Sequence, residues 1–307
     1  MRIRDLKNGE TFTGFVVVKQ SNVSVARNGS KYVDMKIFDG EKELYGKIWD
    51  HKDLPPQVNE VIKIQAILGE YNNNPQLTIK KWRIAAENEY SPAEFLPVYQ
   101  GDRIDLFCKL LAEQNKIMNQ DLKNLLSSVL VTWENEIIEA PAAIGHHHVY
   151  IGGLLVHTCS VLQLALNIAE NDPDYINMDL IRVGAILHDI GKIRTYDWEG
   201  NSFEVSDDGH FLDHIIVGIL MIQEKTKELN VPWETTRKLL HIIASHHGKF
   251  EWGSPVEPST KEALIIHQAD LADGTINKVT REIQIGIEEN KDWVWPKGFK
   301  RPICTKQ

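Results

Sequence analysis

The segment ILHDIGK, residues 186–192, closes an apolar run with a histidine and an aspartate. Helical spacing places His188 on the inward face, because Ile181 lies seven residues before it and Ala185 three residues before it. Asp189 follows directly, and a carboxylate buried without compensation costs several kcal/mol. The segment therefore predicts a helix that carries a polar pair into the core of a helical domain.

Apolar residues three and four apart extend this pattern over the rest of the chain from residue 92 onward. They predict helices over residues 104–114, 121–138, 153–170, 179–189, 211–229, 234–246 and 260–278. Four of these helices point a further polar side chain inward: His157, His214, His246 and Asp270. One inward histidine is usually an ordinary core residue, but this set with two carboxylates indicates bound cations.

The ligand types restrict the chemistry of such a site. Imidazole and carboxylate without thiolate suit manganese, iron, cobalt, nickel or zinc. Two divalent ions about 3.5–4 Å apart can activate a water and hold both the attacking and the leaving oxygen when a phosphodiester is hydrolysed. We therefore expect hydrolysis of phosphate esters, with Asp189 and Lys192 as catalytic candidates. Lys192 could contact a phosphate oxygen, or could simply complete the helix end after Gly191.

The first 90 residues have a different periodicity. Short runs rich in β-branched and aromatic residues predict strands over residues 11–19, 31–38, 42–49, 61–68 and 76–84, with a tight hairpin at Asp39-Gly40. Five strands in this length suit a barrel of the OB type, which commonly binds single-stranded nucleic acid. The candidate contacts are Tyr32, Tyr45, Lys47 and Trp49, although several aromatic rings must fill the barrel instead.

Charge separates along the chain in the same way. Residues 1–90 carry a net charge of +2 and residues 91–307 a net charge of −11. The second segment would therefore repel a polyanion unless cations or basic patches offset it. One basic patch is the stretch 291–307, where five Lys and Arg residues oppose one aspartate near Trp293, Trp295 and Phe299. It either stacks on bases or packs on the body of the protein.

Composition excludes several other classes of protein. The chain has 307 residues, 42% of them hydrophobic and 25% charged, which argues against disorder and fibrous repeats. The longest strongly apolar stretch, residues 215–222, is shorter than a membrane span, and the N-terminus has no apolar signal core. Three separated cysteines suit a reducing compartment, so we expect a cytoplasmic protein without membrane contact.

The ordered set of His157, His188-Asp189, His214, His246-His247 and Asp270 resembles the HD-domain metal-dependent phosphohydrolase superfamily. More narrowly, four segments resemble the YhaM-type 3′-to-5′ exoribonucleases, which also have an N-terminal OB-type barrel: GHHHVYIGGLLVHT (145–158), ILHDIGK (186–192), SHHGKFEWGSP (245–255) and ALIIHQADLAD (263–273).

This resemblance implies a division of the ligands between two ions. His157, His188, Asp189 and Asp270 would hold one ion, and Asp189 would bridge to a second ion held by His214 and His246. His147, His148 and His247 are further candidates for binding an ion or the substrate, and it stays open which of His146, His147 and His148 faces the site. The resemblance implies manganese as the working ion and single-stranded RNA or DNA as the substrate.

The placement of Lys249 and Trp252 directly after the His246-His247 cluster makes them candidates for the substrate path. The expected architecture is α+β with two domains: an OB-type barrel (1–88), a helical connection (89–140), an all-α HD-type domain (141–280) and a C-terminal tail (281–307).

Three functions stay open at this level. The leading one is a metal-dependent 3′-to-5′ exonuclease of single strands. The alternatives are a phosphohydrolase or phosphodiesterase of small nucleotides, which would not need the barrel, and a non-catalytic single-strand-binding protein. Oligomeric state is not predicted.

Overall fold

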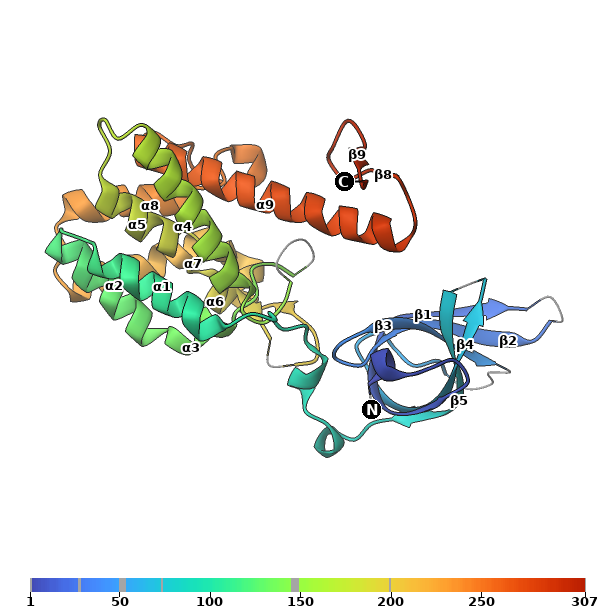
Figure 1. Cartoon of the computed structure of the whole chain (residues 1–307). Coiled ribbons are helices and arrows are strands. Elements are labelled where there is room, and N and C mark those ends of the chain that lie inside the picture. The colour runs from blue at the N-terminus through green and yellow to red at the C-terminus, as the bar shows by residue number, and fades with distance from the viewer. Residues whose placement is uncertain are drawn as a thin grey trace. The chain divides into compact units, whose positions relative to one another are not determined.

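A computed structural model describes residues 2–26, 29–49, 54–72, 74–144, 149–198 and 200–306. Two compact units divide the chain (Figure 1). The first, here called the barrel unit, comprises residues 1–97 and the short stretch 198–203. The second, the helical unit, comprises residues 98–197 and 204–307.

The barrel unit is a closed five-stranded barrel with strand order β1-β2-β3-β5-β4. Antiparallel pairs link its strands except for β3 and β5, which run parallel and complete the circle. This confirms the predicted OB-type barrel. The strands are β1 (Thr11–Val25), β2 (Lys31–Phe38), β3 (Glu43–Trp49), β4 (Val61–Tyr71) and β5 (Asn74–Ile84), and the short 3-10 turns are η1 (Ile3–Asp5), η2 (Glu87–Glu89) and η3 (Pro92–Phe95).

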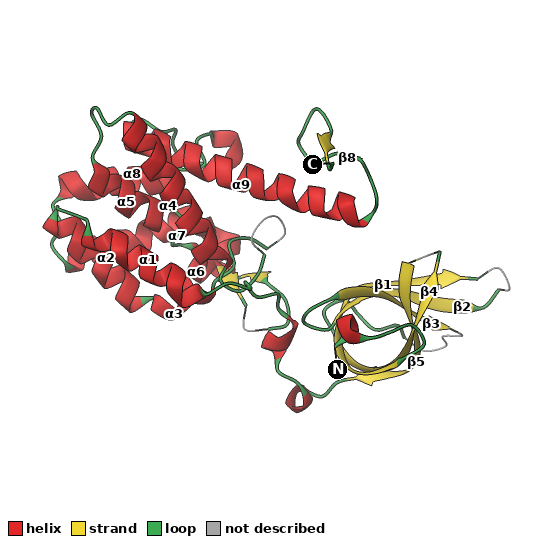
Figure 2. Ribbon diagram, in the orientation of Figure 1, coloured by secondary structure: helices red, strands yellow, loops and turns green. Residues whose placement is uncertain are grey.

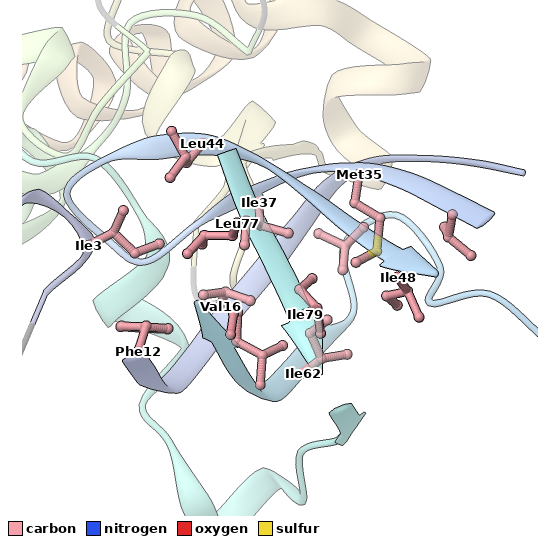
Figure 3. Packing of buried hydrophobic residues seen from close by; sticks show 14 of the residues in the cluster. Ile3, Phe12, Val16, Met35, Ile37, Leu44, Ile48, Ile62, Leu77 and Ile79 are labelled. Carbon is pink, nitrogen blue, oxygen red and sulfur yellow. The ribbon is translucent and has the colours of Figure 1, made fainter. Parts of the chain in front are cut away.

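Side chains alternate between the inside and the outside along the strands, and the inward apolar side chains fill the barrel (Figure 3). Every second residue of β2 and β3 points inward, so that Val33, Met35, Leu44 and Ile48 are buried in one apolar cluster. Gly46 takes an inward position where a Cβ would lie 3.0 Å from Ile79. The intervening residues of the same strands therefore form the outer face.

The helical unit consists mainly of helices, with two small hairpins (Figure 2). Its elements are α1 (Arg103–Asn115), α2 (Gln120–Thr132), α3 (Glu134–Glu139), α4 (Gly153–Asn171), α5 (Met178–Leu187), α6 (Lys192–Thr195), β6 (Tyr196–Asp197), β7 (Glu204–Val205), α7 (Asp207–Glu228), α8 (Trp233–Ser245), η4 (Phe250–Trp252), α9 (Lys261–Glu288), β8 (Trp293–Val294) and β9 (Ile303–Cys304).

Three details differ from the predicted helices. The predicted helix over 121–138 is broken at Trp133, whose ring packs beneath Arg194 and Lys225. Helix α9 continues to Glu288, and Val294 and Thr305 pack closely at Gly286 on its last turns. The last residues of the chain form the β8-β9 hairpin, so the second half of the chain is not helical throughout.

Helix α4 is the central helix of this unit and packs against α5 and α9. By length and composition alone it could cross a membrane, but 56% of its most apolar 18-residue stretch is buried inside the protein. Its burial is that of a core helix, and one of its buried residues is His157.

Candidate metal centre

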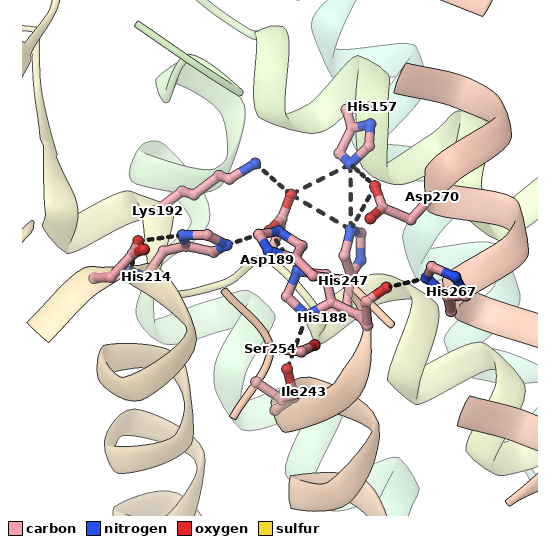
Figure 4. Close-up of polar contacts among 12 residues, drawn as sticks. His157, His188, Asp189, Lys192, His214, Ile243, His247, Ser254, His267 and Asp270 are labelled. Carbon is pink, nitrogen blue, oxygen red and sulfur yellow. Dashed lines mark hydrogen bonds and ion pairs between the residues drawn. The ribbon is translucent and has the colours of Figure 1, made fainter. Parts of the chain in front are cut away.

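Five helices bring the six predicted ligands together, and Figure 4 labels five of these residues. His157 lies within α4, His214 within α7 and Asp270 within α9. His188 and His246 are the C-cap residues of α5 and α8, and Asp189 follows His188. The four histidines and Asp189 are buried, and the Asp270 side chain is 19% exposed.

One oxygen of Asp189 faces the first pair of histidines. Its Oδ2 lies 3.2 Å from Nε2 of His157 and 3.4 Å from Nε2 of His188. Oδ1 of Asp270 approaches the same two nitrogens, at 3.2 Å and 4.0 Å. Three of these residues, His157, His188 and Asp189, offer ligand atoms that all lie within 4.8 Å of one another. This group can hold one ion.

The other oxygen of Asp189 faces the second pair. Its Oδ1 lies 3.4 Å from Nε2 of both His214 and His246. All three of these atoms are buried without a hydrogen-bond partner among the described residues. Unpaired buried polar atoms are costly, and three that converge on one point fit a cation. His247 completes this second group, since its ring lies 5.1 Å from that of His214.

The electrostatics of the centre favour cations. Burial raises the pKa of Asp189 and Asp270, but neighbouring cationic and imidazole groups outweigh it and hold both pKa values below the usual range. Burial lowers the pKa of His214, His246 and His247, which keeps these imidazoles neutral, the form that binds metals. In the first group, burial would lower the pKa of His157, but hydrogen bonds to three aspartates raise this pKa well above its usual value.

Hydrogen bonds at the far ring nitrogens orient the four imidazoles. Nδ1 of His188 bonds to the carbonyl of Ala185 at 2.9 Å, and Nδ1 of His246 bonds to the carbonyl of Ile243 at 2.8 Å. The other two histidines use carboxylates instead. In each case the Nε2 atom is left to face the centre.

These two carboxylates were not predicted from the sequence. Asp273 Oδ2 lies 2.7 Å from Nδ1 of His157, and its other oxygen accepts a hydrogen bond from Ser160. Asp213 Oδ1 lies 2.5 Å from Nδ1 of His214, with a backbone φ of 59° that is uncommon outside glycine. The hydrogen bond with His214 lowers the pKa of Asp213 to about 2. A signal for Asp273 was present, because it stands one helical turn after Asp270.

Lys192 lies beside the shared carboxylate. Its Nζ donates to Oδ2 of Asp189 at 2.6 Å, and the side chain is almost fully buried. Burial lowers the pKa of Lys192, but the charge of Asp189 outweighs this and raises it, so that the ammonium stays charged. A fixed cation therefore stands next to the predicted ligand that faces both histidine pairs.

The turn after α8 carries the predicted substrate residues. Nδ1 of His247 bonds to the carbonyl of Trp252 at 2.8 Å, which ties this turn to the second histidine group. Lys249 Nζ lies 4.5 Å from the centre of the Trp252 ring, and that ring is 43% exposed. His147 and His148, with His146, lie outside the described residues.

The barrel unit presents a second set of candidates on its outer face. The rings of Tyr32 and Trp49 are 5.0 Å apart, and Lys47 Nζ lies 4.9 Å from the first and 5.6 Å from the second. Tyr71 joins them, with its ring 5.2 Å from Lys47 Nζ. Tyr45 is exposed two residues before Lys47 on β3. Other rings, such as Phe38, are buried and fill space instead.

Comparisons with known proteins match both units. The sequence model of the HD domain family covers residues 154–274, and the model TraI_2, which describes a helicase family, covers residues 91–177. Proteins named 3′-5′ exoribonuclease YhaM are similar over 298 residues: those of Listeria monocytogenes serotype 4b (strain CLIP80459) and Listeria welshimeri are each 31% identical, over 92% of this chain and 91% of their own length.

The protein of the same name from Listeria innocua is 30% identical over the same shares. Among solved structures, the second OB-fold domain of replication protein A from Methanococcus maripaludis covers 28% of this chain and 95% of its own, with 12% identity and a TM-score of 0.25. A TM-score this low supports no argument, so the assignment of the barrel rests on its own strand order.

Proposed function

Because this chain belongs to the family of the 3′-5′ exoribonuclease YhaM proteins, we propose that its buried histidines and aspartates hold two divalent ions for the hydrolysis of phosphodiester bonds. The chain is a metal-dependent 3′-5′ exoribonuclease. Family membership favours this activity over the small-nucleotide phosphohydrolase and over the non-catalytic binding protein. We further propose how many ions bind, which ion it is and what the individual residues do.

The arrangement of Asp189 carries the two-ion proposal. Its two oxygens face two different pairs of histidines, each at 3.2–3.4 Å. A single ion would satisfy one pair and leave the other pair buried and unpaired. We assign His157, His188, Asp189 and Asp270 to one ion, and Asp189, His214 and His246 to the second, with His247 as a further ligand.

When bound, such a pair of ions lowers the pKa of a water and neutralises charge on the phosphate. The protein supplies the rest of the chemistry. Lys192, which donates to Asp189, adds a fixed positive charge where negative charge develops on the phosphoryl oxygens. Asp213 and Asp273 keep His214 and His157 turned toward the centre. Trp252 and Lys249 offer a ring and a cation to the end of the substrate.

We assign the grip on the rest of the strand to the barrel. Tyr32 and Trp49 offer ring faces on which bases stack, and Lys47 between them offers charge to phosphates. Stacking tolerates any base, because every base has a flat face. Such a surface suits binding of single strands without sequence preference and does not discriminate RNA from DNA.

Degradation of end-labelled substrates tests the function. The metal-loaded protein should shorten 5′-labelled single-stranded RNA into a ladder that recedes from the 3′ end. Asp189→Asn should remove this activity and keep RNA binding, whereas Asp174→Asn, a change to an exposed aspartate, should alter neither. Release of internal fragments, or activity on mononucleotides alone, would contradict the proposal.

We propose manganese as the working ion, since the imidazole and carboxylate ligands suit it and the family resemblance implies it. Protein stripped with a chelator should lose activity and regain it with Mn²⁺, with Fe²⁺, Co²⁺, Ni²⁺ and Zn²⁺ as comparisons. Metal analysis should give two ions per chain in wild type. One ion per chain in the fully active enzyme would rule out the two-ion arrangement.

A further inference from the structure

The end of the chain forms a small hairpin docked on the last turns of α9. Trp293 pairs with Cys304 and Val294 with Ile303. Val294 and Thr305 are buried and pack at Gly286, where a Cβ would come within 2.4 Å of Val294. The inner side of the hairpin is therefore fixed to the helix, so the two sides of the strand have different surroundings.

The outer side of the hairpin exposes two tryptophans. Trp293 is 58% exposed and Trp295 66% exposed, while Val294 between them is 7% exposed. Strand β8 itself ends at Val294, but exposure continues to alternate beyond it: Val294 and Pro296 are buried, while Trp293 and Trp295 are exposed two residues apart. Two large apolar side chains exposed within three residues form an apolar surface that a binding partner can cover.

The charges around these rings are positive. Lys291 pairs with Glu289 and Lys306 pairs with Asp292. The remaining three cations, Lys297, Lys300 and Arg301, are exposed and make no ion pair among the described residues. Residues 291–307 thus carry a net charge of +4, whereas residues 91–290 carry −15. The hairpin is a basic patch on an acidic unit.

We propose that this hairpin is a second binding surface for single-stranded RNA, separate from the barrel and from the metal centre. Exposed aromatic rings among cations that make no ion pair are what a sequence-independent single-strand site requires. An acidic protein partner would match the charge but would not need two adjacent rings. The inference rests on the proposed function, because it assigns the same substrate to a further part of the chain.

The position of the hairpin along α9 separates it from the chemistry. Gly286 stands sixteen residues after Asp270 on the same helix, which corresponds to about 24 Å. A strand of one or two nucleotides at the metal centre would not reach so far. The hairpin should therefore affect long substrates and leave the shortest ones unchanged.

Binding measurements on variants test the inference. The Asp189→Asn background prevents degradation, and the probe is fluorescent single-stranded RNA longer than about 16 nucleotides, the upper site size of one OB fold. Trp293→Ala and Trp295→Ala should each raise the Kd about five-fold or more. Trp293→Phe and Trp295→Phe should restore most of the affinity. The matched control is Trp233→Ala, which removes a tryptophan that is 63% exposed on α8.

A charge variant gives an independent measurement. Lys300→Gln should lower the slope of log K against log salt by about 0.7, the loss of one phosphate contact on a single strand. Lys227→Gln, at an exposed lysine of α7, should leave the slope unchanged. With an otherwise wild-type chain, cleavage of dinucleotides should keep its kcat and KM in all the hairpin variants.

Two results would overturn the inference. The first is an unchanged Kd in both alanine variants while Lys47→Ala on the barrel weakens binding, which would leave the proposed function intact. The second is unchanged RNA affinity together with a shift in sedimentation of Trp293→Ala, which would make the hairpin a contact between protein chains.

Discussion

At the scale of single residues, the charges around Asp189 govern the behaviour of the site. A buried carboxylate is costly alone, and here Lys192 and the imidazoles offset it from several directions. Lys192 and the histidines that we propose as metal ligands therefore share one carboxylate. Removing the charge of Lys192 should therefore affect metal binding and turnover differently from weakening one of the proposed ligands.

Lys192→Met keeps the volume of the side chain and removes its charge. We expect kcat to fall roughly 100-fold, because a fixed cation acts on the charge that develops in the transition state. Metal affinity should not fall, since a nearby positive charge repels ions. Single-turnover kinetics and a metal titration measure the two separately. A variant that loses its metal instead would show that Lys192 holds the site together.

Asp273→Asn tests the carboxylate behind His157. The hydrogen bond at Nδ1 fixes the ring and raises its basicity, so the variant should bind Mn²⁺ about 10–100-fold more weakly. Competition with a chelator measures this without reference to catalysis. Saturating Mn²⁺ should restore much of the activity. The same change at Asp174, which is exposed, serves as the control.

At the scale of elements, the ends of two helices position two of the proposed ligands. His188 and His246 both follow the last residue of a helix, and each bonds through Nδ1 to a carbonyl three residues earlier. The same local geometry thus serves both histidine pairs. Gly191 adds a close approach, since a Cβ there would lie 2.0 Å from the carbonyl oxygen of His214.

Gly191→Ala should therefore push α7 away from the start of α6. Overpacking of this kind typically costs about 1–3 kcal/mol, and here the backbone that moves carries His214. We expect a lower Tm and weaker metal binding together. Gly200→Ala is the matched control, because a Cβ at that position meets no atom within 4 Å. Equal Tm values for the two variants would contradict the close approach.

At the scale of the whole molecule, an acidic helical unit must act on a polyanion. Residues 91–307 carry −11, and the two divalent ions that we propose would add positive charge at one point only. Long strands must therefore be held elsewhere, on the barrel and, by our inference, on the C-terminal hairpin. The two units have separate cores, which allows their contributions to be measured apart.

Removal of residues 1–97 should raise the KM for long single strands roughly 10-fold or more, because the stacking rings of the barrel are lost. The salt dependence of KM should become flatter with each lost phosphate contact. Cleavage of di- and trinucleotides should change little. Circular dichroism checks that the truncated chain is folded. Equal relative efficiency on long and short substrates would assign another role to the barrel.

The local pattern of the sequence determined which elements form and which faces they bury. Alternation predicted all five barrel strands, and spacing of three and four predicted most helices and put the same six polar residues inward. Both inferences need only neighbouring residues, because the period of the backbone decides which side chains share a face. The period does not say which of the two faces is buried. The sequence therefore could not distinguish exposed rings of the barrel, such as Trp49, from buried ones, such as Phe38.

Only the tertiary structure decided which atoms meet. Asp273 supports His157 from 116 residues away, and Asp189 divides its two oxygens between histidines of different helices. Neither follows from local spacing, since hydrogen bonds and close packing depend on how whole helices cross. The hairpin at the end of α9 likewise packs on the helix at Gly286, where a Cβ would clash with Val294 and Thr305. Periodicity selects the buried face, whereas long-range packing selects the partner.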